Sequence, residues 1–589
     1  MSRPSASSPS SRSLRRPKSS QSPSRRRTAP STNAVATPNR SRTRFSLLAA
    51  PAGSPLPLPF LYPLFFVAVY LAHWNLLQLP YYWDEAGYYI PAALDFFHTG
   101  SLIPTTTLTN AHPPLPSLLL AGWWRLCGGI SVGATRTLVC MIAAFALVGV
   151  FRLARGLAGP IIAGVVTLLT AIYPVWFAQS TLAHADIFAA AFTLWALSFY
   201  LVQPTLVRPA PHRFAWTAVF FSLAALAKET AIVTPAALAL WEIVQLFIAG
   251  PEELADRPGR PVYRRIHLFW IAALAAPVLP LALWYAYHFH RTGFVFGNPE
   301  FLRYNATANL GSARILLSLW HRVVHVTFHM NMYVPVVLTL ALLATAKPIN
   351  LIPRSLRRPA FPAILVIVLG NLVAFSILGG ALLTRYLLPV FPLVLLLCVS
   401  VWTARMRAWA WLAGLTAATF LTALWVNPPY TFAPEDNLTY RDMVILHERA
   451  INLIEKRFPA ATVLTAWPAT SELTRPELGY AHKSFRVTPL ENFTAEEIQK
   501  AAADPGSYDT MLIFSSKWTP PPGALNLSRG HEATDMRYFD FHRDVSPEEA
   551  AAMLHGDIVW QAQSKGEWVA VLRFPRSVEA RLFVPFANK

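Results

Sequence analysis

The chain has 589 residues, of which 54% are hydrophobic and only 14% are charged, and this composition excludes a wholly soluble protein because soluble domains carry roughly 25% charged residues. The formal net charge of +19 comes from an N-terminal tail and from short loops between apolar stretches, a pattern that indicates membrane orientation and argues against nucleic-acid binding. The three cysteines, Cys127, Cys140 and Cys398, all lie in apolar stretches, which excludes a disulfide scaffold or a cysteine-rich zinc module.

The first segment, residues 1–46, is built from Ser, Arg, Pro and Thr and holds 11 Lys/Arg but no acid. Such a segment has too little apolar surface to offset the entropy of ordering the chain, so it is predicted to be disordered. Its charge predicts a cytoplasmic tail. An organelle transit peptide is the alternative, because transit peptides share this composition.

The second segment, residues 47–426, contains eleven apolar stretches of about the length that crosses a bilayer as helix. We predict transmembrane helices at 57–79, 133–153, 160–178, 184–203, 213–227, 231–249, 267–287, 328–346, 361–380, 386–403 and 408–426.

The loops between these stretches predict the orientation, because Lys and Arg accumulate in short cytoplasmic loops. Every second loop is basic, which predicts a cytoplasmic N-terminus, an odd number of crossings and an extracytoplasmic C-terminus. A further crossing at 112–129 would invert the later loops, so we expect this segment to lie in the outer interface. The basic loops carry Arg152 and Arg155; Arg208 and Arg213; Arg257, Arg260, Arg264 and Arg265; Lys347, Arg354, Arg357 and Arg358; and Arg405 and Arg407.

The third segment, residues 427–589, is polar, with strand-like runs at 461–466 and 510–514 and helix-like runs at 440–456 and 494–503. It predicts a small extracytoplasmic α/β domain. The fold class is therefore a polytopic α-helical membrane protein with a C-terminal α/β domain.

Acidic residues are rare before position 427, and most of them fall at predicted outer ends of spans. The first outer loop places Asp84 and Glu85 among Tyr81, Tyr82 and Tyr88. Carboxylates in a partly apolar cleft suit proton abstraction, and tyrosines suit sugar binding. If the loop is helical, the two carboxylates point about 100° apart and need not share a role. An aromatic belt with an incidental acidic pair is the alternative.

Four more candidates lie on the same predicted face. His112 stands before two prolines at a predicted helix start, where its ring could meet a phosphate oxygen. Asp186 lies near the outer end of an apolar helix, where helix capping is the alternative. Lys228 either contacts an anion or only neutralises the adjacent Glu229. Arg385 has no acid nearby in sequence and suits a phosphate group.

The predicted outer loop from residue 288 to 330 is rich in basic side chains. Arg291 and Arg303 are further candidates for a phosphate contact. His321, His325 and His329 follow an i, i+4, i+8 spacing, which predicts one helix face with ligands for a divalent metal, and a basic interfacial helix is the alternative. No other cofactor is implied, since neither a nucleotide-binding Gly-rich loop nor a Gly-x-Ser-x-Gly elbow occurs.

Taken in chain order, the motifs around Asp84, His112, Asp186, Lys228 and Arg385 resemble those of the GT-C membrane glycosyltransferases. The resemblance is greatest to the branch that contains the protein O-mannosyltransferases and the lipid A aminoarabinose transferase. The likeness covers residues 55 to about 426. Members often have Lys where this chain has His112, and Lys-Gly where it has Lys228-Glu229. The motifs are Asp84-Glu85-Ala86 with Tyr88, His112-Pro113-Pro114-Leu115, Asp186, Ala227-Lys228-Glu229 and Arg385-Tyr386-Leu387-Leu388-Pro389.

The resemblance implies transfer of a sugar from a polyprenyl-monophosphate carrier to a lipid, protein or glycan acceptor on the outer face, with inversion. Asp84 would be the catalytic base or the carboxylate that positions the acceptor, and Asp186 a second acid of the same cavity. Glu85 is a further catalytic candidate, from its place beside Asp84. A bacterial inner membrane with a periplasmic site is favoured over the endoplasmic reticulum. A transporter or flippase for a lipid-linked sugar is the competing function, although no inverted repeat is found.

Overall fold

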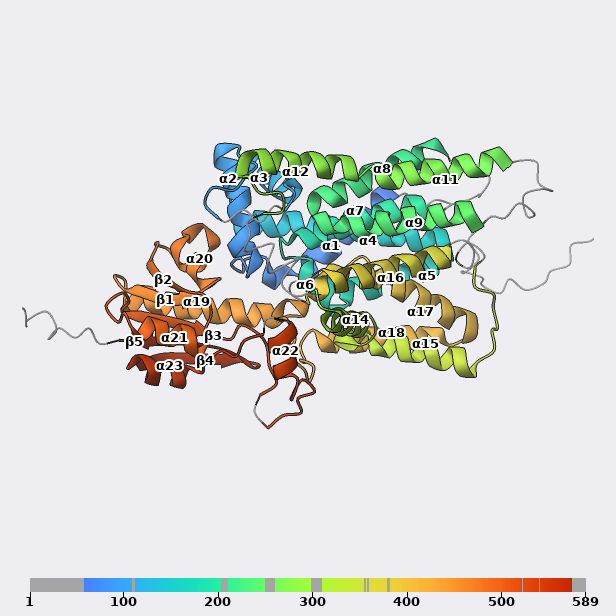
Figure 1. Cartoon of the computed structure of the whole chain (residues 1–589). Helices are drawn as coiled ribbons and strands as arrows, with labels where there is room; N and C mark the ends of the chain where they lie inside the picture. Colours follow the sequence, from blue (N-terminus) through green and yellow to red (C-terminus); the bar gives the residue numbers. More distant parts are fainter. Residues whose placement is uncertain are drawn as a thin grey trace, which may run out of the picture. The chain divides into compact units, whose positions relative to one another are not determined.

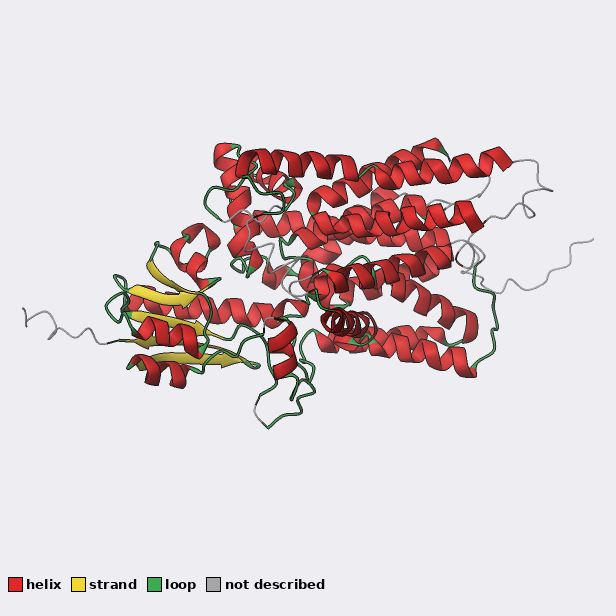
Figure 2. Ribbon diagram, in the orientation of Figure 1, coloured by secondary structure: helices red, strands yellow, loops and turns green. Residues whose placement is uncertain are grey.

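The computed structural model describes residues 58–107, 112–202, 210–248, 260–297, 310–353, 356, 360–378, 382–521, 523–539 and 541–574. The predicted tail, residues 1–46, lies outside the described residues, as does Arg303. Figure 2 shows that the described part up to about residue 430 is helical and that all strands belong to the C-terminal segment.

Each of the eleven predicted apolar spans coincides with a helix or a pair of helices (Figure 1). These helices are α1 (Leu58–Ala72), α4 (Val132–Ala158), α5 (Pro160–Ile172), α6 (Pro174–Gln179), α7 (Ala185–Tyr200), α8 (Pro211–Ala227), α9 (Val233–Ile248), α11 (Arg260–Ala275), α12 (Val278–Thr292), α15 (Tyr333–Thr345), α16 (Phe361–Ile377), α17 (Phe391–Arg405) and α18 (Trp409–Ala423).

Not all of these helices are long enough to cross a bilayer alone. Among the described residues, three segments pass by length and hydropathy: 132–158, 229–247 and 264–292. A fourth passes if α14 (Ser312–Thr327) and α15 are counted together across a 100° bend, and six further apolar helices are shorter. The number of eleven crossings therefore stays a prediction.

Two breaks have clear causes in the sequence. The span predicted at 160–178 divides into α5 and α6 at Tyr173, which is extended because a proline follows it. The bend before α15 lies at Met330, whose φ of +47° is incompatible with a continuous right-handed helix. Both breaks leave short helices that face the candidate site described below.

Helix α7 is the centre of the helical part. Fifteen of its 16 residues are buried, and it packs on α4 and α8. A helix that is apolar on every side lies in a protein core or in a membrane, and the burial of α7 shows that other helices surround it. The polar group at its first turn, Asp186, is thereby held at a fixed place in the interior.

The described part of the first predicted outer loop contains short helices. Tyr89 ends a π-helix, η2 (Glu85–Tyr89), which runs on into α2 (Ile90–Thr99), and α3 (Leu115–Leu126) follows Pro114. With 12 residues, α3 is shorter than the ~20 residues needed to cross a bilayer. Its predicted place at the interface is thus compatible with its length. The other short helices before residue 430 are η1 (Trp74–Leu76), η3 (Glu229–Ile232), η5 (His329–Asn331) and η7 (Thr384–Leu387).

The C-terminal domain is a five-stranded mixed sheet in the order β2-β1-β3-β5-β4. The predicted strands at 461–466 and 510–514 are β1 (Thr462–Ala466) and β3 (Thr510–Phe514). Both pair in parallel with a neighbour, whereas β5 is antiparallel to β3 and β4. The remaining elements are η8 (Pro434–Asp436), α19 (Thr439–Arg457), α20 (Ala469–Thr474), η9 (Pro476–Leu478), β2 (Arg486–Leu490), α21 (Ala495–Ala502), α22 (Glu532–Tyr538), α23 (Pro547–Leu554), β4 (Asp557–Ser564) and β5 (Glu567–Arg573).

The β4–β5 hairpin carries a buried carboxyl group. Its turn is formed by Lys565 and Gly566, both with positive φ, which is the backbone that a tight hairpin of this hand requires. Glu567 follows and is fully buried, and Ser515 Oγ donates a hydrogen bond of 2.5 Å to its Oε2. Burial raises the pKa of Glu567 to about 7, with a smaller contribution from Asp442.

This raised pKa makes the stability depend on pH. Because the folded pKa of about 7 lies above the ordinary value of 4.5, the stabilising effect is complete below pH 4.5 and is lost as the pH rises to 7. We expect the free energy of unfolding to fall by about 3 kcal/mol over that window through this group. Thermal melting of the full chain in detergent at pH 5, 6, 7 and 8 measures this. The Glu567→Gln protein should lose less Tm between pH 5 and 7 than the unaltered protein, and parallel curves for the two would contradict the assignment.

Candidate active site

The centre of the candidate site is the guanidinium group of Arg385 in η7, which is only 3% exposed. Its Nη2 forms an ion pair with Asp84, its Nη1 with Glu435, and its Nε lies 3.2 Å from Asp186 Oδ2. The three carboxylates come from the loop before η2, the start of α7 and the start of the C-terminal domain. Sequence positions up to 301 residues apart thus meet at one side chain.

A second buried cation shares one of these carboxylates. Lys228, the residue after α8, places its Nζ 2.7 Å from Asp186 Oδ1 and 4.2 Å from the centre of the Tyr386 ring. Asp186 therefore lies between Arg385 and Lys228 and holds both cations at fixed positions. The alternative that Lys228 only neutralises the adjacent Glu229 is not what the structure shows.

Glu229 instead binds His112. The His112 Nδ1 lies 2.8 Å from Glu229 Oε2, and its ring stacks on Tyr89 at 5.8 Å between centroids. The predicted phosphate contact of His112 therefore has a carboxylate as its neighbour in this structure. The imidazole is 15% exposed and remains at the surface of a cavity.

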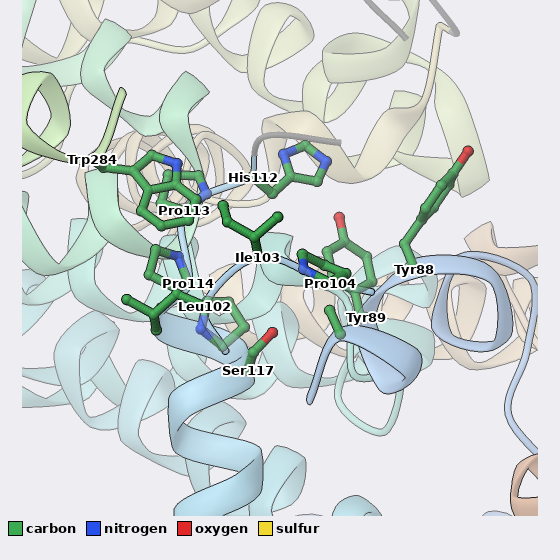
Figure 3. A pocket seen from close by; sticks show the side chains of 12 residues that line it. Tyr88, Tyr89, Leu102, Ile103, Pro104, His112, Pro113, Pro114, Ser117 and Trp284 are labelled. Atoms are coloured by element: carbon green, nitrogen blue, oxygen red, sulfur yellow. The ribbon is translucent and has the colours of Figure 1, made fainter. Parts of the chain in front are cut away.

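Two hollows adjoin these groups. The first, of about 330 Å³, has Asp186, Lys228 and Arg385 on one side and apolar side chains such as Ala190 and Phe375 on the other. The second, of about 420 Å³, is shown in Figure 3 and is lined by His112 and four prolines. Its lining residues are Tyr88, Tyr89, Ala92, Leu102, Ile103, Pro104, His112, Pro113, Pro114, Pro116, Ser117 and Trp284.

The charges of the site are nearly balanced. Burial raises the pKa of Glu435 to about 8, although Arg385 acts in the opposite direction, and the nearby Asp84 adds to the rise. With Glu435 protonated near neutral pH, the two cations Arg385 and Lys228 face the two carboxylates Asp84 and Asp186. An added anion would then meet no large excess of negative charge.

Glu85, which was predicted to be catalytic, does not belong to this cluster. It is fully buried, and its Oε1 lies 2.5 Å from Arg136 Nη1 and accepts the backbone N–H of Ala183. Its Oε2 accepts the backbone N–H of Tyr82 at 2.8 Å. Both oxygens are thus bonded within the protein and join the first loop to α4 and to the segment before α7, an arrangement that favours a structural role.

Of the three tyrosines predicted to bind substrate, two are buried in the core and one lines a hollow. Tyr81 is fully buried with its hydroxyl 2.7 Å from Thr135 Oγ1, and Tyr82 packs edge-on against Tyr440. Tyr81 and Tyr82 therefore belong to the core. Tyr88 is half-buried and lines the larger hollow.

The predicted basic loop proves to contain α14 and does not form the expected histidine face. Helix α14 ends at Thr327, so His329 lies beyond its end and pairs with Asp436 at 2.9 Å, whereas His321 packs on Phe539. His325 is half-buried, and its ring lies 5.5 Å from that of His329 between centroids. Among the described residues, no group of three or more His, Cys, Asp or Glu is placed to hold a metal ion.

The arginines of this region have structural neighbours. Arg314 and Arg322 are buried, and they donate to the carbonyl groups of Ser376 (3.2 Å) and Leu383 (2.8 Å) between α16 and η7. Arg291 is exposed in the last turn of α12 and has no bonded partner within the described ranges. Its predicted phosphate contact therefore remains a prediction.

Two site residues were missed from the sequence. Glu435 follows the last apolar stretch by only a few residues, in a run with Asp436, and that position was the only local signal. His184 lies beside Arg385, with 3.4 Å between Arg385 Nη1 and its Nδ1, and the Nδ1 is 2.9 Å from Gln179 Oε1. Neither position has a spacing that marks it.

Two of three comparisons with known proteins find a similarity, one to a family model and one to solved structures. Residues 111–284 match the family model described as dolichyl-phosphate-mannose-protein mannosyltransferase. A crystal structure of ArnT from Cupriavidus metallidurans bound to undecaprenyl phosphate is similar to this structure with a TM-score of 0.50, at 14% identity over 87% of this chain and 98% of that chain. The apo form of ArnT gives 0.48 at 15% identity over 87% and 97%.

A more distant likeness is to the oligosaccharyltransferase of Archaeoglobus fulgidus in complex with Zn and sulfate, with a TM-score of 0.41 at 13% identity, over 77% of this chain and 67% of that chain. A search of curated protein sequences finds no match. The ArnT likeness extends over the helical part and the C-terminal sheet, and so shows a shared fold.

The contrast between two adjacent carboxylates gives a stability prediction. Glu85→Gln leaves the fully buried Arg136 without its charged partner, so we expect the folded state to lose about 3–5 kcal/mol. Asp84→Asn leaves Arg385 with two carboxylates, and Asp84 is 18% exposed, so a loss of about 1 kcal/mol or less is expected. Thermal melting of both detergent-purified variants tests this. Equal Tm losses would show that Glu85 has no special structural role.

Proposed function

We propose that this chain, which shares its fold with ArnT, is a GT-C membrane glycosyltransferase that transfers a sugar from a polyprenyl-monophosphate carrier to an acceptor on the extracytoplasmic face, with inversion at the anomeric carbon. The observation that carries this proposal is the convergence of Arg385, Lys228, Asp84 and Asp186 at one place beside an apolar hollow.

The two buried cations suit the phosphate of the donor. A guanidinium group binds a phosphate by two parallel hydrogen bonds, and an ammonium group adds a point charge. Arg385 and Lys228 both line the hollow of about 330 Å³, whose other walls include Ala189, Ala190 and Phe375. Apolar walls of this kind would hold the first isoprene units of the carrier. His112 would contribute a contact that depends on its protonation.

Asp84 suits the role of base. With a side chain that is 18% exposed, it is more accessible than Asp186 or Glu435, and its Oδ2 is held by Arg385. Its Oδ1 has no hydrogen-bond partner in the described part of the chain. That oxygen would take the proton of the acceptor hydroxyl or amine as it attacks the anomeric carbon.

The rest of the site supports a direct displacement. The bond from the anomeric carbon to the phosphate oxygen breaks as the acceptor bond forms on the opposite face, which inverts the configuration. The departing polyprenyl phosphate is already an anion, so cationic stabilisation by Arg385 and Lys228 replaces a strong general acid. Asp186 keeps these two cations in position.

The face of the membrane is argued from the helix ends. Asp186 lies at the start of α7 and Arg385 just before α17, whereas the basic loop residues Arg152 and Arg405 lie toward the far ends of α4 and α17. Because basic loops favour the cytoplasm, the site belongs to the opposite face. We propose a bacterial inner membrane with a periplasmic site, and a lipid, protein or glycan acceptor.

The role of Asp84 can be tested with radiolabelled polyprenyl-phosphate sugars and purified protein. Asp84→Asn should lower turnover by at least about 10²-fold, because the base is lost while the donor site is kept. Asp504→Asn, which changes an exposed carboxylate of the C-terminal domain, serves as the matched control and should transfer normally. Near-normal turnover by Asp84→Asn would remove Asp84 from the chemistry.

The role of Arg385 predicts an effect on donor affinity. Arg385→Ala should raise the KM for the polyprenyl-phosphate sugar about tenfold or more, with a smaller effect on the KM for the acceptor, because a charge-assisted contact to phosphate is lost. Arg405→Ala is the control, since Arg405 binds backbone carbonyl groups such as Leu342 O at the other end of α17. An unchanged donor KM in Arg385→Ala would contradict the assignment.

A further inference from the structure

Glu435 is a carboxylate that the C-terminal domain inserts into the membrane site. It lies in η8, which packs on α6 and α19, and its residue exposure is 3%. One carboxyl oxygen, Oε2, pairs with Arg385 Nη1. The other, Oε1, is buried and has no hydrogen-bond partner among the described residues. A buried carboxyl oxygen without a partner is costly, which marks a position that stability alone does not explain.

The next residue, Asp436, makes a useful contrast. Its Oδ2 accepts a hydrogen bond of 3.0 Å from Thr384 Oγ1 and lies 2.9 Å from His329 Nε2. Asp436 thus joins η8 to η5 and η7 through side chains that do not touch the guanidinium group. Of these two adjacent acids, only Glu435 bonds to an N–H group of Arg385 in the described structure.

A phosphate group and these carboxylates need the same N–H groups. Nη2 donates to Asp84 and Nη1 donates to Glu435, whereas Nε lies 3.2 Å from Asp186 Oδ2 without a hydrogen bond. A donor phosphate that binds the guanidinium group through two parallel N–H groups therefore competes with Asp84 or Glu435. Asp186 is also held by Lys228, whereas Glu435 has Arg385 as its one charged partner in the described structure. Asp84 also has Arg385 as its one charged partner there, but as the proposed base it must stay at the site, so Glu435 is the carboxylate that can be displaced.

We propose that Glu435 sets the affinity of the site for the donor: its carboxyl group occupies the Arg385 Nη1 position that the phosphodiester of the donor takes, and it is displaced when the donor binds. This inference rests on the proposed function, because it assumes that Arg385 binds the donor phosphate. It makes the C-terminal domain part of the donor site, through one side chain.

The protonation of Glu435 decides how strongly it competes. The groups that face it are Arg385 from η7, Asp84 before η2, Asp186 on α7, Asp436 on its own element and the Tyr82 ring, with Lys228 behind Asp186. Burial raises the pKa of Glu435 to about 8, so the side chain is mostly neutral at pH 7 and ionised at pH 9. An ionised Glu435 holds Arg385 more strongly and repels the phosphate, so donor binding weakens as the pH rises through about 8.

Calorimetric titration of the full chain in detergent with farnesyl methyl phosphate tests this proposal. This probe is a phosphodiester, so its own charge is constant from pH 7 to pH 9. If binding requires neutral Glu435, the Kd of the unaltered protein rises about tenfold between these pH values. Glu435→Gln, which cannot ionise, should show a Kd that is nearly constant and close to the pH 7 value of the unaltered protein.

Two controls make the outcomes distinct. Asp436→Asn removes a neighbouring charge from the same element but not from Arg385, and it should keep the tenfold rise. Arg385→Ala should lose binding of the probe at every pH. Weaker binding by Glu435→Gln at pH 7 would show that Glu435 positions Arg385 and does not compete with the phosphate, which would overturn the proposal.

An equal rise in Glu435→Gln and in the unaltered protein would also overturn it, since another group would then cause the pH dependence. These results leave the proposed function standing as long as Arg385→Ala abolishes binding. Binding of the probe that does not depend on Arg385 would instead contradict the donor site itself, and with it this inference.

Discussion

The structure depends above all on the pairing of one buried cation. A guanidinium group that is 3% exposed must be compensated by nearby negative charge, because its desolvation costs several kcal/mol. Arg385 meets this requirement with the carboxylates of Asp84 in the first loop and Asp186 in α7, and it also bonds to the carboxyl group of Glu435 from the C-terminal domain, which is mostly neutral at pH 7. These three segments are therefore fixed relative to η7, and the same contacts that stabilise the fold assemble the site. A site of this kind is preorganised, which is what electrostatic catalysis requires.

A second buried pair keeps the first loop in place without taking part in the site. Glu85 binds Arg136 of α4 and the backbone N–H groups of Tyr82 and Ala183, and it leaves no oxygen for substrate. Its neighbour Asp84 can then face Arg385, because the backbone turns at Trp83, whose φ is +43°. Two adjacent carboxylates thus have different surroundings: Glu85 is fully buried against Arg136, and Asp84 is 18% exposed and pairs with Arg385.

Much of the fold could be predicted because its signals are local. Apolar runs of sufficient length coincide with helices, and the two short strand-like runs predicted in the C-terminal segment coincide with β1 and β3. The expected histidine face failed since α14 ends at Thr327 and Phe328, with a φ of −128°, leaves the helical range before His329, and a local backbone change of this kind is not visible in a spacing pattern. The β4–β5 hairpin was missed although Lys565-Gly566 is a turn signal, because β4 alternates polar and apolar residues with little contrast.

The sequence alone determined the membrane class, the alternation of basic loops, the gathering of acids at one set of helix ends and the order of motifs shared with the GT-C enzymes. These properties follow from composition and from periods of a few residues. Only the tertiary structure decided which charge pairs with which, since the partners of Arg385 lie 301 and 50 residues away in the chain. Such pairing is set by the desolvation of charges in a packed interior, and it selected Lys228 for Asp186, withdrew Glu85 from the site and brought Glu435 into it.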